Sequence, residues 1–362
     1  MYQEQMTTVK DIESENEQVQ WLVTTSGAKR AVLYKELLPR VEKGDRVLVN
    51  TTATKMRLGT GGFDIAIHVE GQQCKKRGDS TNEKGHIMKA RYLPYQRTFS
   101  TIEEEGSLSH EQFQHTFTLN KKPVLIAELH SMVILLWALV QELDSQKPIV
   151  VIISDEASLP LAMSEHVQFL KRDPLVTTIT TGQAFGGEYE AVNVVTALQF
   201  AHFHAEDALI VITQGPGVVG TGTKYGFSGL AQAEWANHVG ALDGLPIWVP
   251  RLSQKDQRNR HRGLSHHTYT PLTKFTHVPT YLPLPIDFIE TRVVEIDNIK
   301  KHAHIHLIPK SEYEQFEDLP GALRHVPYPV TTMGRNVRED VLFLSGIAVA
   351  ISTYFDLDPN LG

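Results

Sequence analysis

The sequence predicts a two-domain α/β protein: a small N-terminal β-barrel or sandwich, followed by an open, mostly parallel, doubly wound α/β/α sheet. Short strand-like segments separated by tight turns fill residues 18–70, which is typical of a small barrel or sandwich. From residue 123 onward, short apolar segments alternate with helix-like segments, as in a parallel sheet covered by helices on both faces. A polar stretch separates the two patterns, so we place an N-terminal β-rich domain at 1–115 and an α/β domain at 116–362.

The first domain is expected to contain strands rich in β-branched and aromatic residues. These strands are predicted at 19–25, 29–37, 45–53 and 63–70. The GTGG sequence at 59–62 precedes the last of them, and a hairpin turn explains it better than a phosphate site. Residues 71–88 are polar, contain Cys74 and predict a long loop, while 86–97 predicts one further strand.

The second domain is expected to alternate strands and helices along the chain. Apolar strands are predicted at 123–129, 148–154, 175–181, 208–214 and 245–252. The helices between and after them are predicted at 131–143, 159–172, 190–204 and 229–242. Two late strands, 276–281 and 302–309, and a closing helix, 336–355, complete the expected sheet and its cover.

Composition excludes several classes of protein. The formal net charge is −7, which argues against general binding to nucleic acid or to anionic membranes. Cys74 is the single cysteine, so the chain can form neither an internal disulfide nor a cysteine-based zinc site. The first residues lack the apolar core of a signal peptide, and the apolar run at 341–352 is too short to span a bilayer. We therefore expect a cytoplasmic protein.

Polar residues follow each predicted strand of the second domain at its carboxyl end. In open parallel sheets, ligands bind outside these ends, so the residues there are the first candidates for a site. His130, Asp155 and Glu188 follow three of the strands and are candidate acid–base groups or ligands of a divalent metal. Glu188 also precedes a predicted helix, where a carboxylate can simply complement the helix dipole.

The glycine-rich loop at 214–229 is the expected anion site. It contains Gly-x-Gly-x-x-Gly, but the following helix begins too late, near Ser228, for a dinucleotide fingerprint. Exposed backbone N–H groups before a helix still suit a phosphate, and the alternative is a long loop that needs positive φ angles. The expected ligand-binding residues here are Gly215, Gly217, Gly220, Thr221, Gly222 and Thr223, with Gly186 and Gly187 of a second glycine loop.

The basic segment RNRHRGLSHHTYT, 258–270, follows the last of these strands. We expect Arg260, Arg262 and Ser265 to bind an anion and His266 to act as a catalytic group, with the segment closing the pocket over the strand ends. At most one of His266 and His267 is expected to point inward. The alternative is a solvated loop or a contact between subunits. A second histidine-rich segment, 302–308, is better explained as the exposed face of an edge strand than as a metal site.

Several segments together resemble a bacterial family catalogued as domain of unknown function 3866. They are HIMKARYLPYQ, SDEASLPLAMS, GQAFGGEYEAVN, GPGVVGTGTKYGFSG and HRGLSHHTYT, in this order, and span nearly the whole chain. The string HRGLSHHT also resembles the HRG-x-T-H-S motif of some membrane-associated metal-dependent hydrolases. The family resemblance implies a bacterial cytoplasmic protein and carries no activity.

These observations lead to an expected function. The protein is expected to bind an anionic, phosphate-bearing small molecule at the carboxyl edge of the sheet. A metal-assisted hydrolase or phosphoesterase is one interpretation, and a divalent metal is then the expected cofactor. A non-catalytic sensing or regulatory protein is the alternative. The expected partner is the small anion, without membrane or general nucleic-acid binding, and a homo-oligomer is compatible with the sequence.

Overall fold

The computed structural model describes residues 2–58, 62–72, 85–311, 315–316 and 318–358. Contacts divide the chain into two compact units, residues 1–84 with 92–96 and residues 85–91 with 97–362. Residue 115, where composition changes, lies shortly before the first strand of the large sheet, and contacts assign 97–115 to the second unit.

The first unit is a closed five-stranded barrel with the strand order β1-β2-β3-β5-β4. Its elements are β1 (Glu4–Glu15), β2 (Val19–Thr24), β3 (Arg30–Tyr34), β4 (Arg46–Asn50), α1 (Thr52–Lys55) and β5 (Asp64–Val69). β3 and β5 pair in parallel and the other neighbours are antiparallel. Alternate residues such as Leu22, Val47 and Val49 fill the interior, as the two-residue period of a strand requires. The expected GTGG turn lies partly outside the described residues.

β1 was not predicted because its sequence is polar. Six of its twelve residues are exposed, and Thr7 and Val9 are its buried positions. Pairing with β2 on one side and β4 on the other nevertheless closes the barrel, so β1 depends on its hydrogen-bonded neighbours more than on its own apolar residues.

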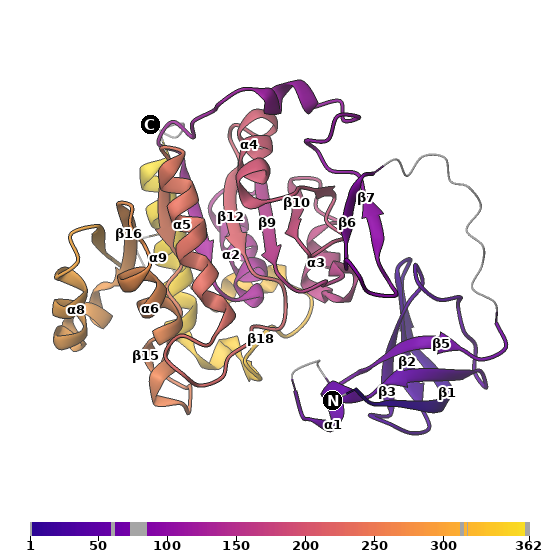
Figure 1. The fold of residues 1–362 in the computed structure, drawn as a ribbon. Coiled ribbons are helices and arrows are strands. Elements are labelled where there is room, and N and C mark those ends of the chain that lie inside the picture. The colour runs from indigo at the N-terminus through magenta and orange to yellow at the C-terminus, as the bar shows by residue number, and fades with distance from the viewer. Residues whose placement is uncertain (1, 59–61, 73–84, 312–314, 317, 359–362) are drawn as a thin grey trace. The chain divides into compact units, whose positions relative to one another are not determined.

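The second unit contains an eight-stranded parallel sheet flanked by helices, as the sequence predicted (Figure 1). The strand order is β11-β10-β9-β12-β8-β13-β16-β17. The strands are β8 (Pro123–Ala127), β9 (Ile149–Asp155), β10 (Val176–Gly182), β11 (Tyr189–Glu190), β12 (Leu209–Thr213), β13 (Leu245–Trp248), β16 (Thr280–Pro285) and β17 (Ile305–Lys310). Smaller paired strands are β6 (Ile87–Lys89) with β7 (Arg97–Phe99), β14 (Leu252–Ser253) with β15 (Gly263–Leu264), and β18 (Thr331–Thr332) with β19 (Arg335–Asn336).

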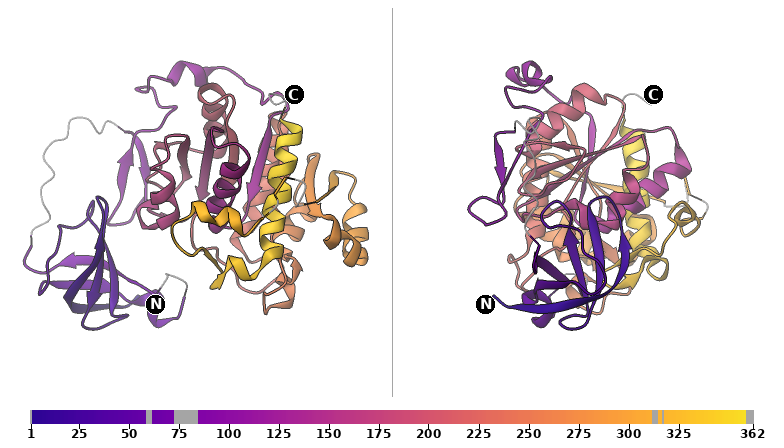
Figure 2. Two further views of the ribbon diagram at one scale, coloured as in Figure 1. Left: turned by 180° about the vertical axis from the view of Figure 1, so that it is seen from behind. Right: turned by 90° about the vertical axis from the view of Figure 1, so that its right-hand side faces the viewer.

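Helices cover both faces of this sheet (Figure 2). Successive residues of β8 alternate between the faces, so Leu125 and Ala127 belong to one hydrophobic cluster and Val124 and Ile126 to the other. The first face packs against α2 (His130–Leu143), α3 (Glu165–Leu170) and α9 (Val341–Leu357). The second packs against α4 (Val194–His204), α5 (Ala231–Ala241), α6 (His266–Lys274), α7 (Ile286–Thr291) and α8 (Val293–Lys300).

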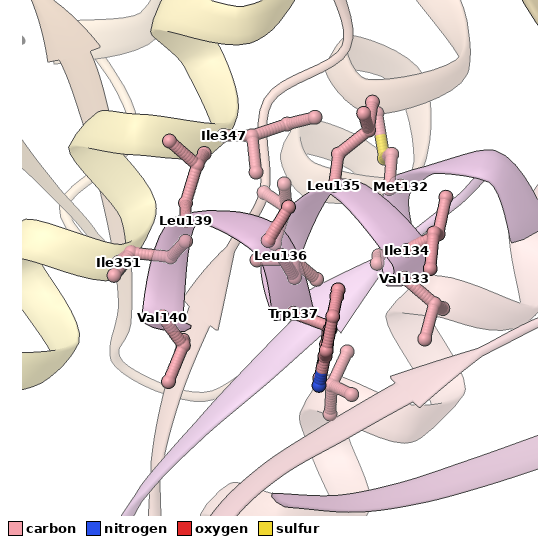
Figure 3. Packing of buried hydrophobic residues seen from close by; sticks show 14 of the residues in the cluster. Met132, Val133, Ile134, Leu135, Leu136, Trp137, Leu139, Val140, Ile347 and Ile351 are labelled. Carbon is pink, nitrogen blue, oxygen red and sulfur yellow. The ribbon is translucent and has the colours of Figure 1, made fainter. Parts of the chain in front are cut away.

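Helix α2 forms the centre of the first face. Its residues from Met132 to Val140 are all buried, and Figure 3 shows Leu139 beside Ile347 and Ile351 of α9. The polar atom of Trp137 is satisfied at the edge of this cluster, where its indole N–H donates to Asp173 at 2.7 Å. A helix that is apolar on every side is stable here because neighbouring elements enclose it.

Two expected helices begin later than predicted because local caps fix their first turns. Ser164 accepts a hydrogen bond from the amide of Val167, so α3 starts at Glu165 and a short 3-10 turn precedes it. Asn193 and Thr196 form a capping box, so α4 starts at Val194. Glu188 and Glu190 therefore do not open a helix: Glu190 lies in edge strand β11 and Glu188 directly precedes it.

The second histidine-rich segment also differs from expectation. His302 and His304 precede β17, so His306 is the histidine that lies on this edge strand. Its side chain is exposed, and the ring of His304 bonds to the carbonyl of Leu272 at 3.1 Å. Within the described residues, no helix combines the length and hydrophobicity needed to cross a membrane.

Replacement of Leu139 by Ala tests the packing of α2 against α9. Leu139 is 1% exposed, so Leu139→Ala should lower the free energy of unfolding by about 2–5 kcal/mol through lost burial and the cavity left behind. Urea denaturation measures the loss. Val294→Ala, at a side chain 78% exposed, is the control and should change stability by less than about 0.5 kcal/mol. Equal effects of the two substitutions would contradict the described packing.

Candidate metal and anion site

A buried ion pair joins the ends of two neighbouring strands. β8 and β13 are parallel neighbours, so the residues that follow them, Glu128 and Arg251, reach the same edge of the sheet. One guanidinium nitrogen of Arg251 donates to both carboxylate oxygens of Glu128, at 3.0 and 3.2 Å. Glu128 is 0% exposed and Arg251 is 3% exposed, so water screens this attraction little.

His267 is the second partner of Glu128. It lies in the first turn of α6, which begins here because the hydroxyl of Ser265 accepts the amide of His267. Nδ1 of His267 is 2.5 Å from Oε1 of Glu128. Burial would raise the pKa of Glu128, but Arg251 and His267 lower it to about 2. Glu128 is therefore ionised at neutral pH and fixes the orientation of the His267 ring.

Three histidines converge beside this ion pair. His261, His266 and His267 place one potential ligand nitrogen each within 4.8 Å of the others, and we call them the histidine cluster. The sequence predicted that at most one of His266 and His267 points inward; both belong to the cluster, with His267 buried and His266 half-buried. The short 3-10 turn at Asn259–His261 brings the third ring over the start of α6, 4.7 Å from His267 between ring centroids.

The free nitrogens of the histidine cluster are suited to a metal. Nε2 of His261 and Nε2 of His266 are buried and have no hydrogen-bond partner in the described chain. Nδ1 of His261 is already held by the hydroxyl of Ser265 at 2.7 Å, as Nδ1 of His267 is held by Glu128. Metal-binding histidines usually carry such a second partner on the other ring nitrogen, because it fixes the tautomer and the ring direction.

The environment also keeps two of these rings neutral. Burial, together with the positive charge of Arg251, lowers the pKa of His261 to about 3. Burial, the neighbouring His267 and Arg260 lower the pKa of His266 to about 4. Neutral imidazole is the form that binds a metal, so these rings need not lose a proton at neutral pH before they do so.

The glycine loop 214–229 meets the histidine cluster and the basic segment. A Cβ atom built on Gly220 would lie 3.8 Å from Cε1 of His267, and one on Gly222 would lie 3.9 Å from the guanidinium of Arg260. The ring of Phe227 stacks on His267 with a centroid distance of 3.9 Å and an angle of 2°. Loop and basic segment thus form one surface around the cluster.

Several amides and hydroxyls of the glycine loop already make hydrogen bonds within the protein. The amide of Gly215 donates to Asp155 and that of Thr221 to the carbonyl of Gly226. The hydroxyls of Thr221 and Thr223 lie 2.9 Å apart and bond each other. Gly217 and Gly222 have φ angles of 101° and 75°, which glycine adopts without strain. Gly217, Gly220 and Gly222 are exposed and present the loop's open backbone.

A basic pocket of about 690 Å³ adjoins the histidine cluster through His266. Three arginines line it, Arg260 and Arg262 from the basic segment and Arg292 from the turn between α7 and α8. Glu295 of α8 lies in the same pocket, and burial raises its pKa against the opposing effect of Arg292. We call this the arginine pocket. Its guanidinium groups suit phosphate or carboxylate oxygens.

The predicted acid–base residue His130 makes structural contacts outside the histidine cluster. His130 is buried, its Nε2 lies 2.6 Å from the hydroxyl of Ser164, and its ring stacks on His166. Burial, with a smaller effect of His166, lowers the pKa of His130 to about 3. These contacts attach the start of α2 to α3, and the histidine cluster is formed by other residues.

The second glycine loop has a packing role. The amide of Gly186 donates to Glu190, and the amide of Gly187 donates to the hydroxyl of Thr180. A Cβ atom on Gly187 would come within 2.7 Å of the carbonyl of Tyr189, so the backbone there has no room for a side chain. Glu188 is exposed beside this loop, and its amide donates to Thr178.

Several residues of the site, among them Glu128, Arg251 and Glu295, were not predicted from the sequence. Glu128 is the acidic residue inside an otherwise apolar segment, and that isolation was the available signal. Arg251 was counted within the predicted strand 245–252, although β13 ends at Trp248. Glu295 had no neighbouring motif, and its place in the arginine pocket follows from the fold alone.

The fold and this site define the class of protein: a two-unit α/β protein with a barrel and a parallel sheet that carries buried ionic and histidine groups at its carboxyl edge. The chain belongs to the family described as "Protein of unknown function (DUF3866)", whose model matches residues 30–351. A search of the curated proteins and a search of the solved structures each found no match.

The buried ion pair predicts a large effect of one substitution. Arg251→Met leaves the Glu128 charge buried with His267 alone, which should lower the free energy of unfolding by about 3–5 kcal/mol. Urea denaturation measures this. Arg324→Met removes an ion pair whose arginine side chain is 64% exposed and should cost less than about 1 kcal/mol.

A second variant isolates the charge. Adding Glu128→Gln to Arg251→Met removes the unpaired carboxylate and should restore part of the lost stability. A double variant less stable than Arg251→Met would show that the loss has another cause.

Proposed function

We propose that the protein is a cytoplasmic metal-dependent hydrolase that acts on a small, anionic, phosphate-bearing molecule at the carboxyl edge of the parallel sheet. The observation that carries this proposal is the histidine cluster, in which two buried Nε2 atoms lack a partner and a carboxylate holds the third ring. Three histidine nitrogens are a ligand set found in catalytic zinc sites, where a further position stays open for water or substrate.

The residues present fit a divalent cation with nitrogen ligands. His261, His266 and His267 would hold it, while Ser265 and Glu128 orient two of the rings. A cation of this kind lowers the pKa of a bound water to about 7 and so supplies a nucleophile at neutral pH. Ionised Glu128 also offsets part of the positive charge that the cation brings into a buried place.

The arginine pocket supplies the groups for an anionic substrate. Arg260 and Arg262 would bind its oxygen atoms, and the tip of the glycine loop at Gly222 lies against Arg260. Glu295 is the acid–base candidate because it lies in the same pocket as the arginines and burial raises its pKa. Asp155 and His130 are not needed for this chemistry.

A non-catalytic metal-dependent sensor is the second candidate function. One observation favours it: the carboxylate that touches the histidine cluster, Glu128, is held as an ion by Arg251 and His267 and is not free to accept a proton. A sensor needs the cluster and the arginine pocket but has no need of Glu295. Whether the metal-loaded protein hydrolyses a phosphate ester therefore distinguishes the hydrolase from the sensor.

Metal binding tests the common part of both functions. Equilibrium dialysis against Zn²⁺ or Co²⁺ should give one ion per chain, and Co²⁺ should show the visible absorption of a tetrahedral or five-coordinate nitrogen site. His261→Ala should weaken binding by about ten-fold or more, because a ligand is lost and two remain. His306→Ala, at an exposed histidine of β17, is the control and should leave it unchanged. Binding that is equal in both variants would remove the proposed centre.

Hydrolysis of p-nitrophenyl phosphate and its diester tests the catalytic part. Glu295→Gln should retain the metal and lower kcat by about 10²–10⁴-fold, the usual contribution of a general acid or base. Arg262→Ala should raise KM, since a charge-assisted hydrogen bond contributes about 1.5–3 kcal/mol. A metal-loaded protein that binds phosphate but hydrolyses neither compound would favour the sensor.

A further inference from the structure

A second pocket lies at the carboxyl ends of β9, β10 and β12. Its volume is about 880 Å³, within the size range of small-molecule sites. Phe227 lines it and also stacks on His267, so the glycine loop borders both this pocket and the histidine cluster. We call it the acidic pocket because three acidic residues line it.

The charge of the acidic pocket is opposite to that of the arginine pocket. Asp155, Glu156 and Glu234 line it, and its described lining residues include neither lysine nor arginine. Asp155 is held in place by the amides of Ala157 and Gly215. Carboxylates without a cationic partner repel phosphate and accept hydrogen bonds, so this pocket suits a ligand rich in hydroxyl or N–H donors.

A buried polar atom in the wall of the acidic pocket lacks a partner. Thr181, the penultimate residue of β10, is 0% exposed and lines the pocket, and its hydroxyl has no hydrogen-bond partner in the described chain. Nδ1 of His238, on α5 and also in the lining, is in the same situation. Buried polar groups are nearly always paired, so these two point to a polar ligand group that the protein itself does not supply.

The acidic pocket also has an apolar and aromatic part to its lining. Phe227, Trp235 and Phe275 contribute to it together with Leu230 and Ala231. Phe275 is 39% exposed and therefore offers an accessible ring face or edge. A ligand that fills the pocket thus needs a flat apolar part for this wall and hydroxyl groups for the strand ends.

We propose that the acidic pocket binds an uncharged ribonucleoside, with its ribose hydroxyls on the carboxylates of Asp155 and Glu156 and on Thr181, and its base against the aromatic wall. A strand-end carboxylate is also the group that holds ribose hydroxyls in dinucleotide-binding sheets, which shows that the chemistry is suitable. The site requires no metal and is separate from the proposed hydrolytic centre.

Isothermal titration of the full chain, treated with EDTA to remove metal, tests this proposal. Adenosine, guanosine, cytidine and uridine are the probes, and at least one should bind. Its 2′-deoxy counterpart should bind about ten-fold more weakly or worse, because the lost hydrogen bond is one to a charged carboxylate. The 5′-monophosphate should bind no more tightly than the nucleoside, because the pocket contains carboxylates and no described cation.

Two variants locate the binding. Thr181→Val keeps the shape of the side chain and should weaken binding of the nucleoside, and Glu156→Gln should do the same through an exposed residue that the fold does not need. Arg262→Ala, in the arginine pocket, is the control and should leave it unchanged.

Three results would overturn the proposal: no nucleoside binds, free ribose binds as tightly as the nucleoside, or the variants Thr181→Val and Glu156→Gln bind as the wild type does. Because the protein is metal-free in this test, each result is independent of whether the histidine cluster hydrolyses anything.

Discussion

The buried charge of Glu128 is the constraint on which the site depends. A carboxylate that is 0% exposed is tolerable only if the protein surrounds it with compensating groups, and Arg251 and His267 do so. One comes from the end of β13 and the other from the first turn of α6, so a single side chain fixes the ends of two strands and the start of a helix. The directions of His267 and, through Ser265, of His261 follow from this arrangement.

The glycine loop 214–229 gives the edge of the sheet two different surfaces. On the side of Gly222 it lies against Arg260, where positive charge gathers. Through Phe227 and Ser228 it also borders a pocket in which the charged residues are carboxylates. A long loop with several glycines can contact both because its backbone approaches neighbouring side chains closely. The amide of Gly215 donates a hydrogen bond to the carboxylate of Asp155 and so anchors the loop to the end of β9.

Most of the fold could be predicted from the sequence because the local periodicity of apolar residues indicates strands and helices. Apolar strands and amphipathic or buried helices show such a pattern within a few residues. β1 does not, because its partners supply most of its stability. The site was only partly readable. The glycine loop and the basic segment stood out by composition, but the pairs Glu128–His267 and Glu128–Arg251 join residues 139 and 123 positions apart. No local pattern encodes such a contact, and a lone glutamate in an apolar strand looks like an irregularity until its partners are in place.

The position of β8 in the sheet has a consequence for biosynthesis. β8 is the first strand of the sheet to be made, yet both of its neighbours, β12 and β13, come much later in the chain. The ribosome must travel from Ala127 to Leu209 before the first of them exists, which takes on the order of ten seconds at about 5–20 residues per second. Throughout that interval the fully apolar strand β8 has neither of its sheet neighbours, although β9 and β10 can already pair with each other. The centre of the large sheet therefore forms late in synthesis, whereas the barrel, whose last strand ends at Val69, can close early.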